Sequence, residues 1–235
     1  MVRPRYASTV VLVRPDAEAG FQILLTRRPP EMRFMGGFYV FPGGAVHEED
    51  YSPRVLQRCR GLSGEQAREM LGRRHTAELA LGHWVAVVRE LYEEVGVLLC
   101  ENHRGMPVDP SDQRSKQRLE QKRRALIRER SSFGEVLESE NLFCDLSRVI
   151  YFFHRITPEF YPMRFDTRFY LAALPPYQTA LPSSEEVTES LWIKPQDALG
   201  RPYDDFPILP PTTTVLEILG DIVSWNGLQR RYRFP

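Results

Sequence analysis

Residues 81–100, LGHWVAVVRELYEEVGVLLC, constrain the fold of this chain more than any other segment. Apolar residues recur there three and four positions apart, which at about 100° per residue gives a helix one core-facing flank. The other flank carries Glu90, Glu93 and Glu94, because residues three and four apart are neighbours on a helix. Gly96 then acts as a stop signal. We therefore predict a core helix that ends near Gly96 and carries its carboxylates on a polar face.

Two interpretations of this acidic patch are open. Like charges three or four positions apart destabilise a helix by roughly a few tenths of a kcal/mol, so they need either solvent or a cation nearby. A Gly-rich turn, Phe41-Pro42-Gly43-Gly44, lies upstream. Adjacent glycines let the backbone approach a ligand without hindrance from a Cβ atom. The pairing of this turn with a carboxylate helix favours a metal site over a solvated surface.

Residues 89–97, RELYEEVGV, resemble the second half of the Nudix hydrolase signature G-x5-E-x7-R-E-U-x-E-E-x-G-U, in which U is a bulky apolar residue. They match it at every fixed position, and Gly44 matches the leading glycine. The spacing differs, because 45 positions separate Gly44 from Arg89 and 31 of them are additional to the signature. Asp50 stands where the signature has its first glutamate. The supporting acid is therefore altered, whereas the ligand-bearing half is intact.

The resemblance implies a fold as well as an activity. The expected fold class is α/β, a Nudix-type α/β/α sandwich with a mixed sheet, and residues 1–235 are expected to form one such domain. Polar segments with helical propensity indicate helical insertions at about 50–76 and 101–140. The chain has no internal repeat and no Pro/Gly/Ser linker, which favours one domain over two.

Strands and further helices follow from local patterns. A helix is expected over residues 63–71, and a last helix over 212–225 with Thr212 or Thr213 as its cap. Runs of apolar and β-branched residues predict strands, the first two of which form a hairpin, at 7–14, 21–28, 38–41, 149–156, 168–174 and 187–193.

The family resemblance also implies roles for particular residues. Glu90, Glu93 and Glu94 carry over as metal ligands, with Glu90 also a candidate general base. The carbonyl of Gly44 is a further candidate ligand. Arg89 would orient the glutamates, so these four charged residues form the expected catalytic set.

A fourth acid often comes from a distant loop in this family. Glu186, in the segment before the last expected strand, is the candidate for that ligand. Carboxylate and carbonyl oxygens are the ligands that Mg²⁺ and Mn²⁺ prefer, so one of these ions is the expected cofactor.

Residues ahead of the signature resemble a second element. Residues 24–28, Arg33, Gly37 and residues 41–44 are similar to the L-L-T-x-R … R-x3-G-x3-F-P-G-G element of coenzyme A diphosphatases, with a gap one residue longer. The substrate-binding residues expected from this similarity are Arg28, Arg33, Gly43 and Gly44.

The implied reaction is metal-dependent hydrolysis of coenzyme A or acyl-coenzyme A to 3′,5′-ADP and a 4′-phosphopantetheine product. One alternative is a Nudix hydrolase of ADP-ribose, NADH or dinucleotide polyphosphates. Another is a Nudix-fold nucleotide sensor or interaction module without catalysis. For the first insertion, we hypothesise that it covers the pantetheine arm of the substrate.

Composition limits the partners and the compartment. Thirty-one basic and 31 acidic residues cancel, which gives no electrostatic footprint for nucleic acid or an anionic membrane. Cys59, Cys100 and Cys144 are too widely spaced for a disulfide framework or a zinc site. No segment reaches the ~18 apolar residues of a membrane span. We expect a cytoplasmic protein whose partner is a small nucleotide, with a homodimer left open.

Overall fold

The computed structural model describes residues 2–32, 35–181, 184 and 187–233. The strands are β1 (Arg5–Pro15), β2 (Phe21–Arg27), β3 (Tyr39–Val40), β4 (Gly43–Ala45), β5 (Cys59–Arg60), β6 (Cys100–Asn102), β7 (Leu142–Asp145), β8 (Ile150–Ile156), β9 (Phe165–Ala173) and β10 (Glu189–Ile193). The helices are α1 (Pro53–Leu56), α2 (Gly64–Leu71), α3 (Ala77–Val95), α4 (Gln113–Ile127), α5 (Phe133–Ser139), α6 (Pro195–Leu199), α7 (Pro210–Gly220) and α8 (Trp225–Tyr232), with 3-10 turns η1 (Glu48–Tyr51) and η2 (Leu146–Arg148).

A mixed sheet forms the centre of the molecule. Its strands follow the order β10-β2-β1-β9-β8, with β3 beside β2 and β4 beside β1. β1 and β2 form the expected antiparallel hairpin, in which Val13 lies opposite Ile23. β1 also runs parallel to β9, from Arg5 opposite Phe165 onward. This parallel pair among antiparallel ones makes the sheet mixed, as the sequence predicted.

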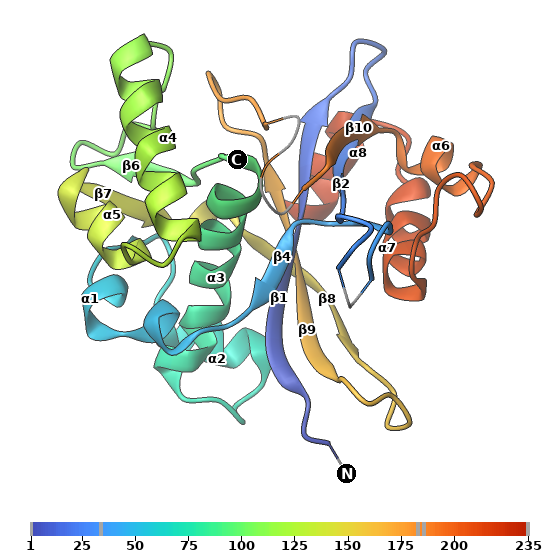
Figure 1. The fold of residues 1–235 in the computed structure, drawn as a ribbon, viewed down its shortest axis with the longest axis horizontal. Helices are drawn as coiled ribbons and strands as arrows, with labels where there is room; N and C mark the ends of the chain where they lie inside the picture. Colours follow the sequence, from blue (N-terminus) through green and yellow to red (C-terminus); the bar gives the residue numbers. More distant parts are fainter. Residues whose placement is uncertain (1, 33–34, 182–183, 185–186, 234–235) are drawn as a thin grey trace.

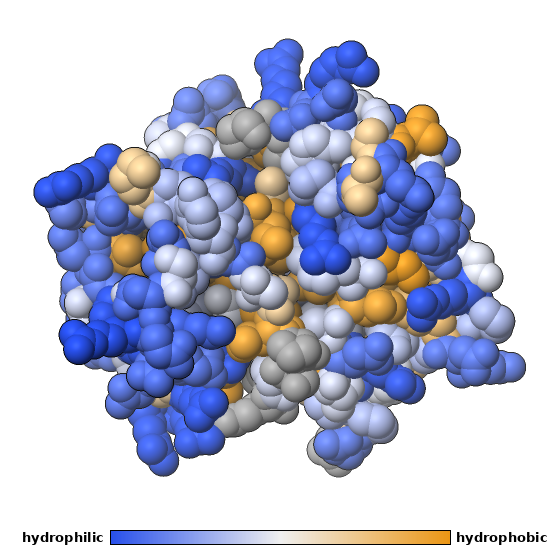
Figure 2. Space-filling view, turned by 90° about the horizontal axis from the view of Figure 1, so that it is seen from above, coloured by the Kyte–Doolittle hydropathy of each residue, from blue (hydrophilic) through white to orange (hydrophobic). Residues whose placement is uncertain are grey.

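Helices cover both faces of this sheet, so the predicted α/β/α arrangement is confirmed (Figure 1). On one face α3 packs on β1 and β4, around a core that contains Trp84, Leu91 and Tyr170. On the other face the core contains Val215 and Leu219 of α7. Seen from above, hydrophobic residues show at the centre of the surface and hydrophilic ones surround them (Figure 2).

α3 is the helix predicted from the apolar stripe. It begins earlier than that stripe, at Ala77, because the side chain of Thr76 accepts a hydrogen bond from Leu79 N and caps the first turn. It ends at Gly96, which has a left-handed conformation with φ 71°. Both ends of the helix are thus fixed by local chemistry.

The predicted start of the last helix is wrong. α7 begins at Pro210, with Leu209 at the N-cap, and not at a threonine cap. Proline is tolerated in the first helical turn because the missing N–H would have no intrahelical partner there. The helix ends at Gly220, and Trp225 begins α8 after Ser224.

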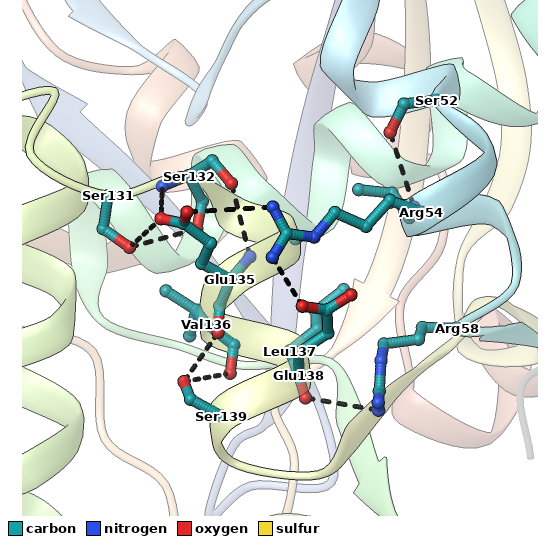
Figure 3. A network of polar contacts seen from close by, with 12 residues as sticks. Ser52, Arg54, Arg58, Ser131, Ser132, Glu135, Val136, Leu137, Glu138 and Ser139 are labelled. Atoms are coloured by element: carbon teal, nitrogen blue, oxygen red, sulfur yellow. Dashed lines mark hydrogen bonds and ion pairs between the residues drawn. The ribbon is translucent and has the colours of Figure 1, made fainter.

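The two insertions pack together into one lobe beside α3, and Figure 3 shows their contact between Arg54 of the first insertion and Glu138 of the second. Arg54 of α1 donates to Glu138 of α5, and Gly134 N of α5 donates to Glu49 Oε1 of η1 at 3.2 Å. β5 of the first insertion pairs with β7, which follows the second. The insertion inside the motif therefore packs against the insertion that follows the motif.

A small sheet in this lobe brings together cysteines that are distant in the sequence. β7 lies between β5 and β6, and places Cys144 opposite both Cys59 and Cys100. All three are free thiols. Among the described helices, none is long and apolar enough to cross a membrane.

Candidate functional site

The glycine turn and the carboxylate helix meet where β4 lies between β1 and α3. Gly44 pairs with Ser8, and Gly43 pairs with Thr9. A Cβ atom on Gly43 would collide with the Ser8 carbonyl oxygen, and a Cβ atom on Gly44 would collide with Glu90 Oε1. Only glycine therefore lets the Glu90 carboxylate rest directly on this strand.

Arg89 connects the parts of the site. Its Nε and Nη2 donate to the two carboxylate oxygens of Asp50 at 2.8 and 3.1 Å. Its Nη1 donates to Glu90 Oε1 and to Glu93 Oε2, each at 2.8 Å, and its Nη2 donates to the carbonyl oxygen of Ala45 at 2.9 Å. The residue is 3% exposed. One buried guanidinium thus holds β4, η1 and two glutamates together.

Asp50 occupies the position of the supporting acid in the motif, and the sequence alone did not predict its partner. It is 1% exposed, and its Oδ2 also accepts a hydrogen bond from His47 N at 2.8 Å. The signal was its position six residues after Gly44, where the family signature has an acid. Because aspartate reaches Arg89 with both oxygens, the shorter side chain leaves no gap in the contact.

The predicted polar face is wrong in one respect, because the carboxylates are largely buried. Glu90 and Glu94 are each 6% exposed. The side chain of Glu93 is 16% exposed. β4 and η1 pack against this flank of α3 and exclude most solvent from it. The helical wheel grouped the three side chains correctly but contained no information about the segments that cover them.

Burial also changes the proton affinity of this cluster. It raises the pKa of Glu93 to about 7, although the neighbouring Arg89 favours the charged form; Glu90 raises the pKa further. A cation beside Glu93 would stabilise its carboxylate and reverse the shift. The side chain is thus suited to exchange a proton, or to take up a metal ion, near neutral pH.

His83 lies on α3 ahead of the carboxylates. Its Nδ1 is 2.9 Å from Ser8 Oγ, and both residues are buried. Burial lowers the pKa of His83 to about 2, and Arg168 and His75 lower it further. The neutral ring joins α3 to β1 next to the Gly44 pair, which is a structural role.

Arg28 follows the end of β2. Its Nε is buried and has no hydrogen-bond partner within the described part of the chain. Its backbone exchanges hydrogen bonds with Gly37 and Phe38 at the base of a loop. The adjacent Arg27 is engaged, because its Nε donates to Gly37 O at 3.2 Å and its guanidinium lies over the Tyr39 ring. Arg28 therefore has a buried donor without a protein partner among the described residues, and its role in substrate binding stays a prediction.

Two of the predicted site residues lie outside the described residues. Arg33 is the first, expected to bind substrate, and Glu186 is the second, expected as the loop ligand. Their roles stay predictions from the sequence.

The donor set fits a divalent cation in its chemistry. The carboxylates of Glu90, Glu93 and Glu94 are hard oxygen donors of the kind that Mg²⁺ and Mn²⁺ prefer, and Glu90 rests on the Gly44 backbone. In the described ranges, no three His, Cys, Asp or Glu side chains are already grouped as a ligand set. Binding of an ion would therefore require the glutamate oxygens to turn toward it from their contacts with Arg89.

A family model described as the NUDT19 Nudix domain matches residues 5–213. A Caenorhabditis elegans protein named as a nudix hydrolase is 25% identical over 223 residues, which cover 94% of this chain and 62% of that protein. The Gallus gallus protein named "Acyl-coenzyme A diphosphatase NUDT19" is 26% identical over 252 residues, which cover 92% of this chain and 65% of that protein. The chain thus spans less than two thirds of the length of either relative.

A solved structure shows the same architecture. The crystal structure of a NUDIX hydrolase from Alicyclobacillus acidocaldarius has a TM-score of 0.76 and 25% identity, with 96% of this chain and 95% of that chain covered. The similarity therefore extends through both insertions as well as the central sheet.

Proposed function

This chain belongs to the Nudix hydrolase family, and we propose that it hydrolyses the diphosphate bond of a nucleoside diphosphate joined to another moiety. The observation that supports this activity best is the contact of Arg89 with Asp50, Glu90 and Glu93 beside the glycine turn. A solvated acidic surface would not require such a buried guanidinium. The arrangement is suited to hold several carboxylates together at one place on the sheet.

The site residues have two proposed roles, which are to hold the metal ion and to accept a proton. Glu90, Glu93 and Glu94 would hold the divalent ion, with the Gly44 carbonyl and Glu186 as further ligands. When bound, Mg²⁺ or Mn²⁺ offsets negative charge that develops on the diphosphate and makes water a better nucleophile. Glu90 would accept the proton of the attacking water at its carboxylate.

Arg89 would act through the glutamates and not on the substrate. Its guanidinium fixes the orientation of Glu90 and Glu93, and Asp50 fixes the guanidinium. Orientation of this kind lowers the reorganisation needed when charge develops in the transition state. Arg89 is therefore a positioning residue in this proposal.

For the substrate we propose coenzyme A or acyl-coenzyme A. The Gallus gallus relative carries the name of an acyl-coenzyme A diphosphatase. The residues from Leu24 to Gly44 resemble the element found in such enzymes, and the buried Nε of Arg28 is a donor suited to an anionic oxygen. Arg33, Gly43 and Gly44 complete the proposed substrate contacts.

The test is a side-by-side measurement of turnover with Mg²⁺ or Mn²⁺. Coenzyme A, acetyl-coenzyme A, ADP-ribose, NADH and a dinucleotide polyphosphate are supplied at equal concentrations, and products are separated by chromatography. We expect 3′,5′-ADP and 4′-phosphopantetheine from coenzyme A at the highest kcat/KM. A higher kcat/KM for another compound would overturn the substrate, and cleavage of none would overturn the activity.

A further inference from the structure

A cavity of about 640 Å³ opens at the C-terminal end of α3, between α4 and the loop of residues 175–181. Tyr92 and Gly96 of α3 line it, and they stand on either side of Glu93 in the sequence. The cavity is therefore lined by residues one position before and three positions after a carboxylate of the proposed site.

We propose that this cavity binds the amide-containing arm attached to the second phosphate of the substrate. The inference rests on the proposed function, which places the diphosphate at the carboxylates. The sequence led us to expect that the first insertion covers this arm. α2 instead packs along the first half of α3, starting where Gly64 meets Ala77, whereas α4 packs beside its end.

One face of α4 supplies polar groups to the cavity. The lining residues recur three and four positions apart along the helix, so they form a single stripe. They are Gln113, Lys116, Gln117, Glu120, Arg123 and Arg124. The amide side chains among them can donate and accept hydrogen bonds, which matches the peptide-like amides of the arm.

Two cations of this stripe are paired within the protein. Arg123 donates to both oxygens of Glu120 at 2.9 and 3.0 Å, and Arg124 Nε donates to Glu120 Oε1 at 2.9 Å. Arg123 is also held by the carbonyl oxygen of Glu93. Both guanidinium groups are thus engaged, which leaves the glutamine amides and Lys116 of the stripe to contact a ligand.

The opposite wall of the cavity is a loop that hydrogen bonds fix to the body of the protein. Gln178 accepts from Leu98 N at 2.8 Å and donates to Leu98 O at 2.9 Å and Val108 O at 3.2 Å, which fixes the loop to the body. Leu181 N donates to Val95 O at 2.9 Å. A fixed wall costs little ordering entropy when a ligand binds.

Tyr177 is the aromatic residue of this wall. It has φ 65°, an unfavourable conformation for a bulky residue, and it is 73% exposed. The ring lies on the cavity edge, where it can cover the methylene and methyl groups of the arm.

The experiment measures binding of coenzyme A by isothermal titration calorimetry with EDTA present, so that affinity is independent of turnover. Tyr177→Gly removes the ring and relieves the backbone strain, which protects the fold. Gln117→Ala removes an amide, and Gln121→Ala, on the same helix but not lining this cavity, is its matched control. ADP-ribose, which lacks the arm, is the matched control ligand.

We expect Tyr177→Gly and Gln117→Ala to raise the Kd for coenzyme A by about 5-fold to 10-fold, the effect of roughly one lost contact. The Kd for ADP-ribose should stay unchanged in both cavity variants. The Kd for coenzyme A should stay unchanged in Gln121→Ala. Equal Kd values for wild type and both cavity variants would overturn the cavity even if coenzyme A is hydrolysed. Variant-sensitive binding without hydrolysis in the presence of Mg²⁺ or Mn²⁺ would instead overturn the proposed function and keep the cavity. If EDTA abolishes binding, the KM for coenzyme A with Mg²⁺ replaces the Kd, with the same expected change and the same contradicting result.

Discussion

Arg89 Nε donates a hydrogen bond to Asp50 Oδ1 at 2.8 Å, although 39 positions separate the two residues in the chain. Asp50 lies in η1, just after the glycine turn, and Arg89 lies in α3. This contact brings the two halves of the motif together in space, although the first insertion separates them in the sequence. The remaining polar contacts of the site are arranged around this pair.

Arg89→Met should destabilise the protein strongly. The change leaves Asp50 buried without its cation, and breaking a buried pair costs about 3–5 kcal/mol. Chemical denaturation gives the free energy of unfolding. Arg68→Met removes the partly exposed partner of Glu65 and is the control, with an expected change within about 0.5 kcal/mol. Equal effects of the two substitutions on the free energy of unfolding would contradict the proposal that Arg89 holds the site together.

Glu93→Gln should separate activity from stability. Burial already favours the neutral form of this side chain near pH 7, so the neutral amide should change the free energy of unfolding by less than about 1 kcal/mol. Turnover should fall by about 100-fold or more, the scale on which loss of one preorganised charge slows a reaction. Steady-state kinetics and denaturation on the same preparation measure both. A large loss of stability with little loss of rate would favour a structural role.

Removal of divalent metal should lower the melting temperature. An ion that binds only the folded state at about 100 times its Kd stabilises by about 2.7 kcal/mol, or roughly 5–10 °C for a chain of this size. The shift between EDTA and Mg²⁺ or Mn²⁺ should vanish in Glu93→Gln. It should persist in Glu78→Gln, an exposed carboxylate in the first turn of the same helix. An identical shift in both variants would place the metal elsewhere.

The contribution of His83 to stability should fall as the pH drops below 6.5. Burial lowers the pKa of His83 to about 2 from its usual 6.5. Between these values the unfolded chain binds a proton at His83 that the folded protein does not, so this contribution is complete above pH 6.5 and declines below it by up to about 1.4 kcal/mol per pH unit. Glu93 acts in the opposite direction, because its pKa, raised from 4.5 to about 7, lets the folded protein hold a proton that the unfolded chain has lost.

His83→Gln tests that slope. Glutamine can keep a hydrogen bond to Ser8 but does not titrate. The slope of the free energy of unfolding against pH, between pH 6.5 and 5, should therefore decrease by the equivalent of close to one proton. His103→Gln changes an exposed histidine and should leave the slope as it is. Denaturation curves at several pH values give the slopes, and parallel slopes for all three proteins would refute the assignment to His83.

The features that the sequence predicted well depend on short-range patterns. The apolar stripe and Gly96 located α3, and alternating strands located the central sheet. The start of α3 needed the Thr76 cap, which the stripe does not contain. The small sheet was not predicted, since β5 has two residues and β6 three, which is too few for a period-two pattern.

The site shows where local reasoning stops. Periodicity grouped Glu90, Glu93 and Glu94 on one flank of the helix. It could not show that β4 and η1 bury that flank, because burial depends on contacts between distant segments. The raised pKa of Glu93 and the partner of Arg89 follow from the same contacts, so they too required the structure.

The additional residues between Gly44 and Arg89 form part of the lobe. Glu49, just after the glycine turn, contacts α5, and β5 pairs with β7. Closing a longer surface segment adds only slightly to the entropy of folding. Relatives could therefore lengthen or shorten this stretch while the acidic side chains keep their positions. A search that demands fixed intervals would overlook such proteins, whereas one that matches pairs of residues across space would find them.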